Sequence, residues 1–186
     1  MDHPLTLAQT ADLIARHVLA EEALFSLTGR WSAHPGAGDT PTGIAGTSQA
    51  LFAAESAHHG WRAEQWSQRR VRSLPEESTG TAVANEPDAL TGAVEDLLGQ
   101  EVAPMAQLAV WGHVLAPTLA GIYRQHRDAL APSADGGVER WLAICVTDLN
   151  RGSIEAVAVL AAQGYDSGVE EAADSVRSAL ARVLGG

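Results

Sequence analysis

Glu55-Ser56-Ala57-His58 is the stretch of this chain that most directly indicates its fold, and it is the only Glu-x-x-His in the sequence. It lies midway along a long helical pattern, where a carboxylate and an imidazole three residues apart share one helix face. In the preceding helical segment, His17 and Glu21 stand at similar spacing. Two such helices, packed together, converge on a metal ion or a polar substrate. The sequence therefore predicts a bundle of long helices with carboxylates inside.

Four long segments carry apolar residues at the spacing of an amphipathic helix. They are predicted to span residues 5–31, 48–72, 103–130 and 138–163. Pro75 ends the second segment, because a proline disfavours helical geometry in the residue before it. Pro117 lies inside the third segment and is expected to kink that helix. The fold class is therefore predicted to be all-α.

The connections between these helices differ in length. Residues 32–47 are rich in glycine and proline and have no periodic pattern, which is typical of a mobile connection or of a lid over a site. A long crossover, with a short amphipathic helix at 88–98, is predicted between the second and third helices. Residues 132–137 make a short turn, and a final amphipathic helix is predicted at 169–184.

Length and composition indicate one domain, spanning residues 1–186. Of these 186 residues 46% are hydrophobic, which is enough for a well-buried core. No apolar run reaches the roughly 18 residues needed to cross a bilayer, and the N-terminus lacks the features of a signal peptide. The single cysteine, Cys145, cannot form an internal disulfide, which agrees with a reducing compartment. We therefore expect a cytoplasmic protein without a membrane partner.

The charged residues exclude several kinds of chemistry. All 12 basic residues are arginine, so a lysine Schiff base, a pyridoxal phosphate attachment and a Walker lysine are ruled out. The formal net charge of -11 repels a phosphate backbone, and the arginines are spread along the chain apart from Arg69, Arg70 and Arg72. Nucleic acid is therefore not an expected partner.

The plan of four long helices, with a short turn between the third and fourth and a long crossover between the second and third, resembles the ferritin-like bundle. The resemblance covers residues 5–163 and rests on this architecture and on Glu55-x-x-His58. The helix at 169–184 lies outside it. The resemblance implies an up-down bundle in which two helices each supply a glutamate, and the other two each supply Glu-x-x-His, to a di-iron site.

Part of this implied ligand set is missing. Glu21 or Glu22 matches the carboxylate of the first helix, and Glu55 with His58 matches the pair of the second, with His59 as a competing ligand. The third helix has no Asp or Glu between residues 101 and 128. The fourth offers only Asp148-Leu149-Asn150-Arg151, and an arginine does not ligate a cation because its guanidinium stays protonated. A full di-iron site is therefore not expected, and the predicted cofactor is none.

Arginines are expected to take the place of the missing metal. Arg62 and Arg151 are predicted to pair with buried carboxylates, which are Asp148, Glu55 and Glu21. Such a network leaves a charged, partly dry pocket suited to a polar ligand or to acid-base chemistry.

The third helix offers two further candidates for this pocket. His113 and Tyr123 are predicted to reach it from the third helix, His113 because it shares a helix face with the small residues Ala109, Ala116 and Ala120. His17 is interpreted as a histidine at the border of its helix, and Cys145 as a small buried apolar residue. The five tryptophans are expected to pack in the core or at its rim.

Three functions remain open from the sequence. The first is a ferritin-like bundle adapted to metal-independent, redox-neutral acid-base chemistry on a small polar metabolite, alone or as one subunit of a catalytic pair, as in specialised natural-product biosynthesis. Glu55 or Glu21 is then the general base and His58 or His59 a proton carrier, while Arg62 and Arg151 clamp the substrate. The second is an iron-dependent oxidase or hydroxylase that uses Glu21, Glu55 and His58. The third is a non-catalytic protein that forms homo- or hetero-oligomers through its helix faces.

Overall fold

The computed structural model describes residues 5–34, 43–69, 103–130 and 136–164, and all regular secondary structure in these ranges is helical. This part of the chain confirms the predicted all-α class and the four long helical segments. The helices are α1 Leu7–Ala33, α2 Ile44–Gln68, α4 Pro104–Val110, the π-helical turn η2 Trp111–Leu115, α5 Ala116–Asp128 and α6 Gly136–Ala162.

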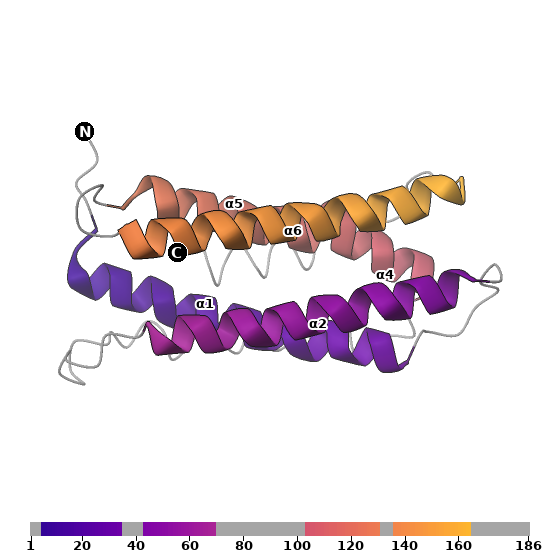
Figure 1. Ribbon diagram of the computed structural model, residues 1–186, viewed down its shortest axis with the longest axis horizontal. Coiled ribbons are helices and arrows are strands. Elements are labelled where there is room, and N and C mark those ends of the chain that lie inside the picture. The colour runs from indigo at the N-terminus through magenta and orange to yellow at the C-terminus, as the bar shows by residue number, and fades with distance from the viewer. Residues whose placement is uncertain (1–4, 35–42, 70–102, 131–135, 165–186) are drawn as a thin grey trace.

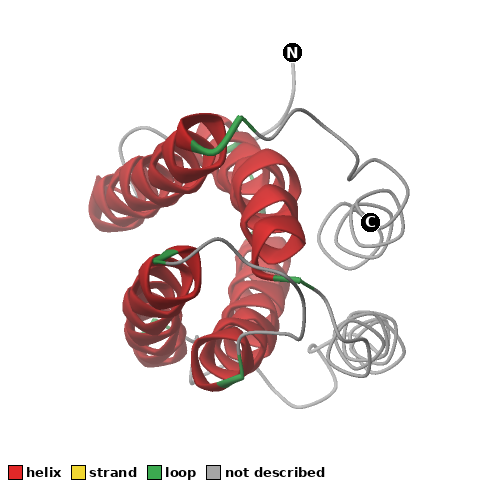
Figure 2. Cartoon of the chain, turned by 90° about the vertical axis from the view of Figure 1, so that its right-hand side faces the viewer, coloured by secondary structure: helices red, strands yellow, loops and turns green. Residues whose placement is uncertain are grey.

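The described helices pack side by side as a bundle (Figure 1). α1 packs most extensively on α2, and α5 on α6, whereas the contact between α2 and α6 is limited. α1 and α6 run in one direction, and α2 and the α4–α5 segment run in the other (Figure 1). Seen end-on, the helices surround a shared centre (Figure 2). Large apolar side chains fill this centre, among them Leu24, Phe52, Leu119 and Leu149.

Local sequence explains where the first two helices begin. Thr6 caps α1: its hydroxyl accepts a hydrogen bond from the Gln9 N–H at 3.2 Å, and its own N–H donates to Gln9 Oε1 at 2.8 Å. α2 begins at Ile44, four residues before the predicted start. Gly43 precedes it with φ 101°, a left-handed conformation that glycine adopts without strain, and Ile44 is buried.

The predicted kink at Pro117 takes the form of a π-helical turn in the residues just before it. The Ala116 N–H donates to the carbonyl of Trp111, five residues back, and Pro117 has no N–H to donate. The Gly112 carbonyl therefore loses its backbone donors. The Ser153 hydroxyl of α6 donates to this carbonyl at 2.7 Å, so the widened turn also joins the third helical segment to α6.

Several predicted segments lie outside the described residues. They are the crossover with its helix at 88–98, the helix at 169–184, residues 35–42 of the proposed lid at 32–47, residues 132–135 of the turn at 132–137 and the end of the second helix beyond residue 69. Of the described remainder, residues 32–33 belong to α1, 44–47 to α2 and 136–137 to α6.

The segment Pro104–Asp128 is long and apolar enough to cross a membrane by length and composition alone. This corrects the sequence-based expectation that no segment of the chain reaches that size. Within the bundle, 67% of its most apolar stretch is buried, as in the core helix of a soluble protein.

Candidate functional site

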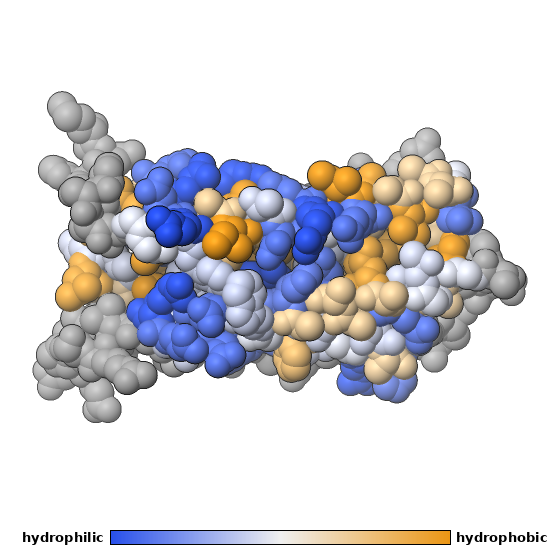
Figure 3. All heavy atoms as spheres, in the orientation of Figure 1, coloured by the Kyte–Doolittle hydropathy of each residue, from blue (hydrophilic) through white to orange (hydrophobic). Residues whose placement is uncertain are grey.

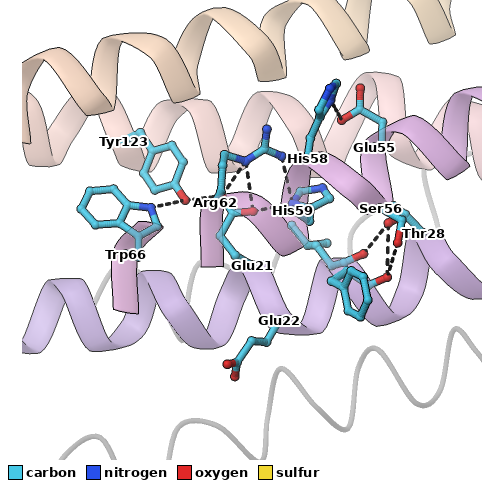
Figure 4. Close-up of polar contacts among 12 residues, drawn as sticks. Glu21, Glu22, Thr28, Glu55, Ser56, His58, His59, Arg62, Trp66 and Tyr123 are labelled. Atoms are coloured by element: carbon cyan, nitrogen blue, oxygen red, sulfur yellow. Dashed lines mark hydrogen bonds and ion pairs between the residues drawn. The ribbon is translucent and has the colours of Figure 1, made fainter. Parts of the chain in front are cut away.

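The centre of the bundle holds a polar cluster around Glu21, whose side chain is fully buried. The guanidinium of Arg62 donates through Nε to both carboxylate oxygens, at 3.0 and 3.1 Å. The Tyr123 hydroxyl also donates to Oε1, and His59 Nδ1 lies 2.5 Å from Oε2. Figure 4 shows these side chains meeting from α1, α2 and α5, while Glu22 points away from them. The inward position predicted for Glu21 is confirmed, and Glu22 is exposed.

The electrostatics of this cluster keep Glu21 ionised. Burial by itself raises the pKa of Glu21, but the charge of Arg62 and the hydrogen bonds from His59 and Tyr123 outweigh it and lower that pKa. Burial lowers the pKa of His59 to about 4, so this imidazole is neutral at pH 7. The 2.5 Å contact between His59 Nδ1 and the Glu21 carboxylate needs a proton between the two atoms, so with His59 neutral and Glu21 ionised that proton lies on Nδ1. Arg62 Nη2 lies 3.0 Å from the same nitrogen and is the competing contact. The cluster is thus a neutral assembly built on one buried ion pair.

A second set of ring side chains extends the cluster toward the start of α1. Trp66 Nε1 donates to the Tyr123 hydroxyl at 3.1 Å. His17 lies 4.8 Å from both the Trp66 and Tyr123 rings, and its Nε2 is hydrogen-bonded to Nδ1 of His126 at 2.8 Å. Burial, followed by the neighbouring His126, holds the pKa of His17 well below its usual range. The interpretation of His17 as a border histidine was therefore wrong, because the ring is fully buried in an aromatic cluster.

Glu55 forms a separate centre at the contact between α2 and α6. It is only 4% exposed, and its Oε2 has no hydrogen-bond partner among the described residues. Burial raises the pKa of Glu55 to about 7, against the opposing charges of Arg62 and Arg151. The half-buried His58 has Nδ1 4.0 Å from this oxygen. The two candidate histidines therefore divide: His59 belongs to Glu21 and His58 lies beside Glu55 (Figure 4).

Gly152 of α6 makes room for the Glu55 carboxyl. A Cβ atom at position 152 would lie 2.2 Å from Oε1 and 2.9 Å from Cδ of Glu55. Any side chain there would have to push the carboxyl away, since such distances are far below van der Waals contact. Gly152 thus has a steric role that the sequence did not reveal.

Replacing Gly152 by alanine should test this close approach. In a helix, alanine is about 1 kcal/mol more favourable than glycine. Gly121→Ala should therefore raise the free energy of unfolding by about this amount, because a Cβ at position 121 meets no atom within 4 Å. Gly152→Ala should instead be less stable than Gly121→Ala by about 1–3 kcal/mol, as overpacked sites are. Urea denaturation of both variants measures the difference. Equal gains would show that Glu55 does not approach α6 in this way.

Three predicted substrate-binding residues lie elsewhere than expected. Arg151 contacts Asp148 at 3.6 Å and Glu155 at 4.0 Å, but its side chain is 55% exposed, so it is no buried counter-charge. Asp148 is half-buried and meets Glu55 only through its electrostatic field. His113 is exposed, although Ala109 is buried. The π-helical turn shifts the spacing at this point, so the buried face of the segment bypasses His113.

Other sequence-based assignments agree with the structure. Tyr123 and Arg62 reach the interior as predicted. Cys145 is buried, and burial raises its pKa, which fits a small apolar packing residue. Four tryptophans are buried, whereas Trp61 is 45% exposed at the rim.

His126 and Gly152 are the site residues that the sequence reasoning missed. His126 follows Tyr123 by three residues and so shares its helix face, which was a usable signal. Gly152 had no such signal, because only the packing of α6 against Glu55 reveals its role.

Among the described residues, no group of three or more His, Cys, Asp or Glu side chains is arranged to hold a metal ion. The alternative iron ligands Glu21, Glu55 and His58 are therefore not assembled, because Glu21 is engaged by Arg62, His59 and Tyr123. Comparison with protein-family models, with curated proteins and with solved structures found no match to this chain.

Proposed function

We propose that this protein is a ferritin-like bundle that catalyses metal-independent, redox-neutral acid-base chemistry on a small polar metabolite. The observation that carries the proposal is Glu55. Its carboxyl is buried against Gly152, its Oε2 has no partner among the described residues, and its pKa is raised to about 7. A carboxyl with these properties exists in both protonation states near neutral pH, which is what a general acid-base group needs.

The ferritin-like topology is supported by helix direction. The antiparallel α1–α2 pair and the antiparallel α5–α6 pair place α2 and α5 parallel to each other (Figure 1). A chain that leaves α2 at one end of the bundle and re-enters at the other end needs a long crossover, and 35 residues separate Gln68 from Pro104 in the sequence.

The Glu21–Arg62 ion pair supports a catalyst that does not depend on metal. Arg62 is fully buried, and Glu21 raises its pKa in spite of the opposing effect of burial, so its charge is permanent. A guanidinium bound to Glu21 occupies a carboxylate that an iron ion would otherwise take. In the proposed mechanism Glu21 therefore holds Arg62 in position, and the proton transfer falls to Glu55.

His58 is the proposed proton carrier between Glu55 and the solvent. Its ring is about one-third exposed, and burial followed by the charge of Arg62 lowers its pKa, so it is neutral at pH 7. The 4.0 Å gap to Glu55 Oε2 is one that a bridging water can close. On the face of α2 and α6 shown in Figure 3, polar residues gather over the left and middle and apolar residues toward the right-hand end. The polar part suits the approach of a polar substrate.

The partners and location follow from the same proposal. The substrate is a small molecule, and neither nucleic acid nor a membrane takes part. The protein acts in the cytoplasm, in natural-product or similar small-molecule tailoring, and it can pair with a second subunit through a helix face.

The test combines metal content with turnover. After expression with added iron and manganese, the purified protein should hold less than about one ion per chain, because no complete ligand set is assembled. Metal-free protein should convert at least one component of a mixture of small polar metabolites, followed by mass spectrometry. Glu55→Gln should slow this conversion by about 100-fold or more, as loss of a general base does. Glu22→Gln, an exposed matched control, should not.

Three results would contradict the proposal. Two tightly bound iron ions per chain would favour the iron-dependent oxidase or hydroxylase. Conversion that survives in Glu55→Gln would remove Glu55 from the chemistry, and no conversion at all would favour the non-catalytic interaction protein.

A further inference from the structure

Between Glu55 and Arg62, one face of α2 carries three buried polar atoms that have no hydrogen-bond partner among the described residues. Ser48 Oγ, two turns earlier on this face, and His58 Nδ1, beside Glu55, are two more. The three are Oε2 of Glu55, Nε2 of His59 and Nη1 of Arg62. These residues follow one another at four- and three-residue spacing, so they line the same side of the helix. Each of these three residues is at least nine-tenths buried. Buried polar atoms normally have a hydrogen-bond partner.

A fourth such atom comes from the third helical segment. The Trp111 ring stands edge-on to His59, with ring centroids 5.2 Å apart and planes at 88°. Its Nε1 is buried and has no partner within the described part of the chain. Trp111 opens the π-helical turn, so the shift in spacing at this turn helps to place the indole against α2.

The hydrogen-bonding roles of these atoms are fixed by their chemistry. Arg62 Nη1 and Trp111 Nε1 only donate. His59 Nε2 only accepts, because Nδ1 carries the proton that is given to Glu21. Glu55 Oε2 accepts when the carboxyl is ionised. Two donors and two acceptors therefore lie on or against the stretch of α2 from Glu55 to Arg62, next to an ion pair whose charges already balance.

We propose that these four atoms form a binding site for a small neutral group that carries a carbonyl acceptor next to an N–H donor, as in a primary carboxamide. The carbonyl accepts from Arg62 and Trp111, and the two N–H groups of the carboxamide donate one each to His59 and Glu55. This inference rests on the proposed function and names its substrate class. The half-buried His58, beside Glu55, marks the solvent side of this stretch of α2.

Charged ligands fit the same atoms less well. A cation meets the unused donors of Arg62 and Trp111, and buried like charges repel strongly. An anion meets the lone pair of His59 and, above pH 7, the ionised Glu55. Ordered water also satisfies buried polar atoms, so the experiment has to separate water from an organic ligand.

Acetamide, acetate and methylammonium form a matched set of probes for the full-length protein. Acetamide and acetate have the same shape and differ in charge and donors. In ¹H–¹⁵N spectra at pH 8, acetamide should shift the indole N–H signal of Trp111, which Trp111→Phe identifies, and the ring signals of His59. We expect millimolar affinity, because a ligand of four heavy atoms gains at most about 6 kcal/mol.

A matched pair of variants assigns the binding to Glu55. Glu55→Gln should raise the dissociation constant of acetamide about fivefold or more, the effect of losing one charged hydrogen bond. Glu22→Gln should leave it unchanged, because Glu22 is exposed and points away from the cluster (Figure 4).

The outcomes separate this inference from the proposed function. Acetate or methylammonium binding as tightly as acetamide would overturn the ligand class. Signals of Trp111 and His59 that do not move with acetamide would mean that only ordered water fills the site, and the inference fails. If Glu55 still titrates near pH 7 in that sample, the proposed function stands. If Glu55 titrates as an ordinary glutamate in that sample, the proposed function fails as well.

Discussion

Arg62→Ala should lower the free energy of unfolding by about 3–5 kcal/mol at pH 7, the largest stability effect expected of a single substitution in this bundle. The reason is the partner that it leaves behind. Glu21 is fully buried, and Arg62 supplies both its counter-charge and two of its hydrogen bonds. Without the guanidinium, the carboxylate must either stay charged in the interior or take up a proton, and both states cost free energy.

Two further variants make this result specific. Arg151→Ala removes the same side chain from a site that is 55% exposed, and it should change stability by less than about 1 kcal/mol. The double variant Glu21→Gln, Arg62→Met removes both charges and should recover part of the loss. Urea denaturation measures all three. An Arg62→Ala effect as small as that of Arg151→Ala would mean that the ion pair is not buried as described.

Glu55→Gln should make the protein more stable than the wild type at pH 8, but not at pH 4.5. The folded-state pKa of Glu55 is raised to about 7, whereas a glutamate in the unfolded chain ionises near 4.5. Its stabilising contribution is therefore fully present below about pH 4.5 and is lost as the pH rises through 7. This difference between the folded-state and unfolded-state pKa of Glu55 corresponds to a loss of about 3 kcal/mol in the free energy of unfolding. Glutamine stays neutral at every pH, so the variant should avoid this loss.

The measurement is the free energy of unfolding of the wild type and of Glu55→Gln between pH 4.5 and 8. The difference between the two proteins should grow through this range, and Glu22→Gln should show no such trend, because its carboxyl is exposed. A difference that is the same at both ends of the range would show that Glu55 has an ordinary pKa in the folded protein.

The helices of this chain were predictable because their apolar spacing is regular. All four long segments are present, with ends displaced by a few residues where a special backbone position decides, as at Gly43 before α2. The position of His113 was not predictable from regular spacing. The π-helical turn before Pro117 shifts the face that the helix presents to the core, and this shift depends on which carbonyl Ala116 selects.

The centre of the site was also predictable in part. Glu21, Glu55, His59, Arg62 and Tyr123 all reach the interior, since they lie on the apolar faces of their helices. Their grouping into two centres was not foreseen, because it depends on how far α2 lies from α6 and on the space that Gly152 provides. Arg151 was assigned to the interior from its position in a degenerate motif, but its side chain points to solvent.

The pKa of Glu55 tests the central claim most directly. In a protein labelled with ¹³C at the glutamate carboxyl carbons, titration by NMR should reveal one carboxyl with a pKa of about 7, and its signal should be absent from Glu55→Gln. A carboxyl that titrates near neutral pH supports Glu55 as the acid-base group. A pKa of Glu55 between about 4 and 5, the range of a solvated glutamate, would contradict the proposed function.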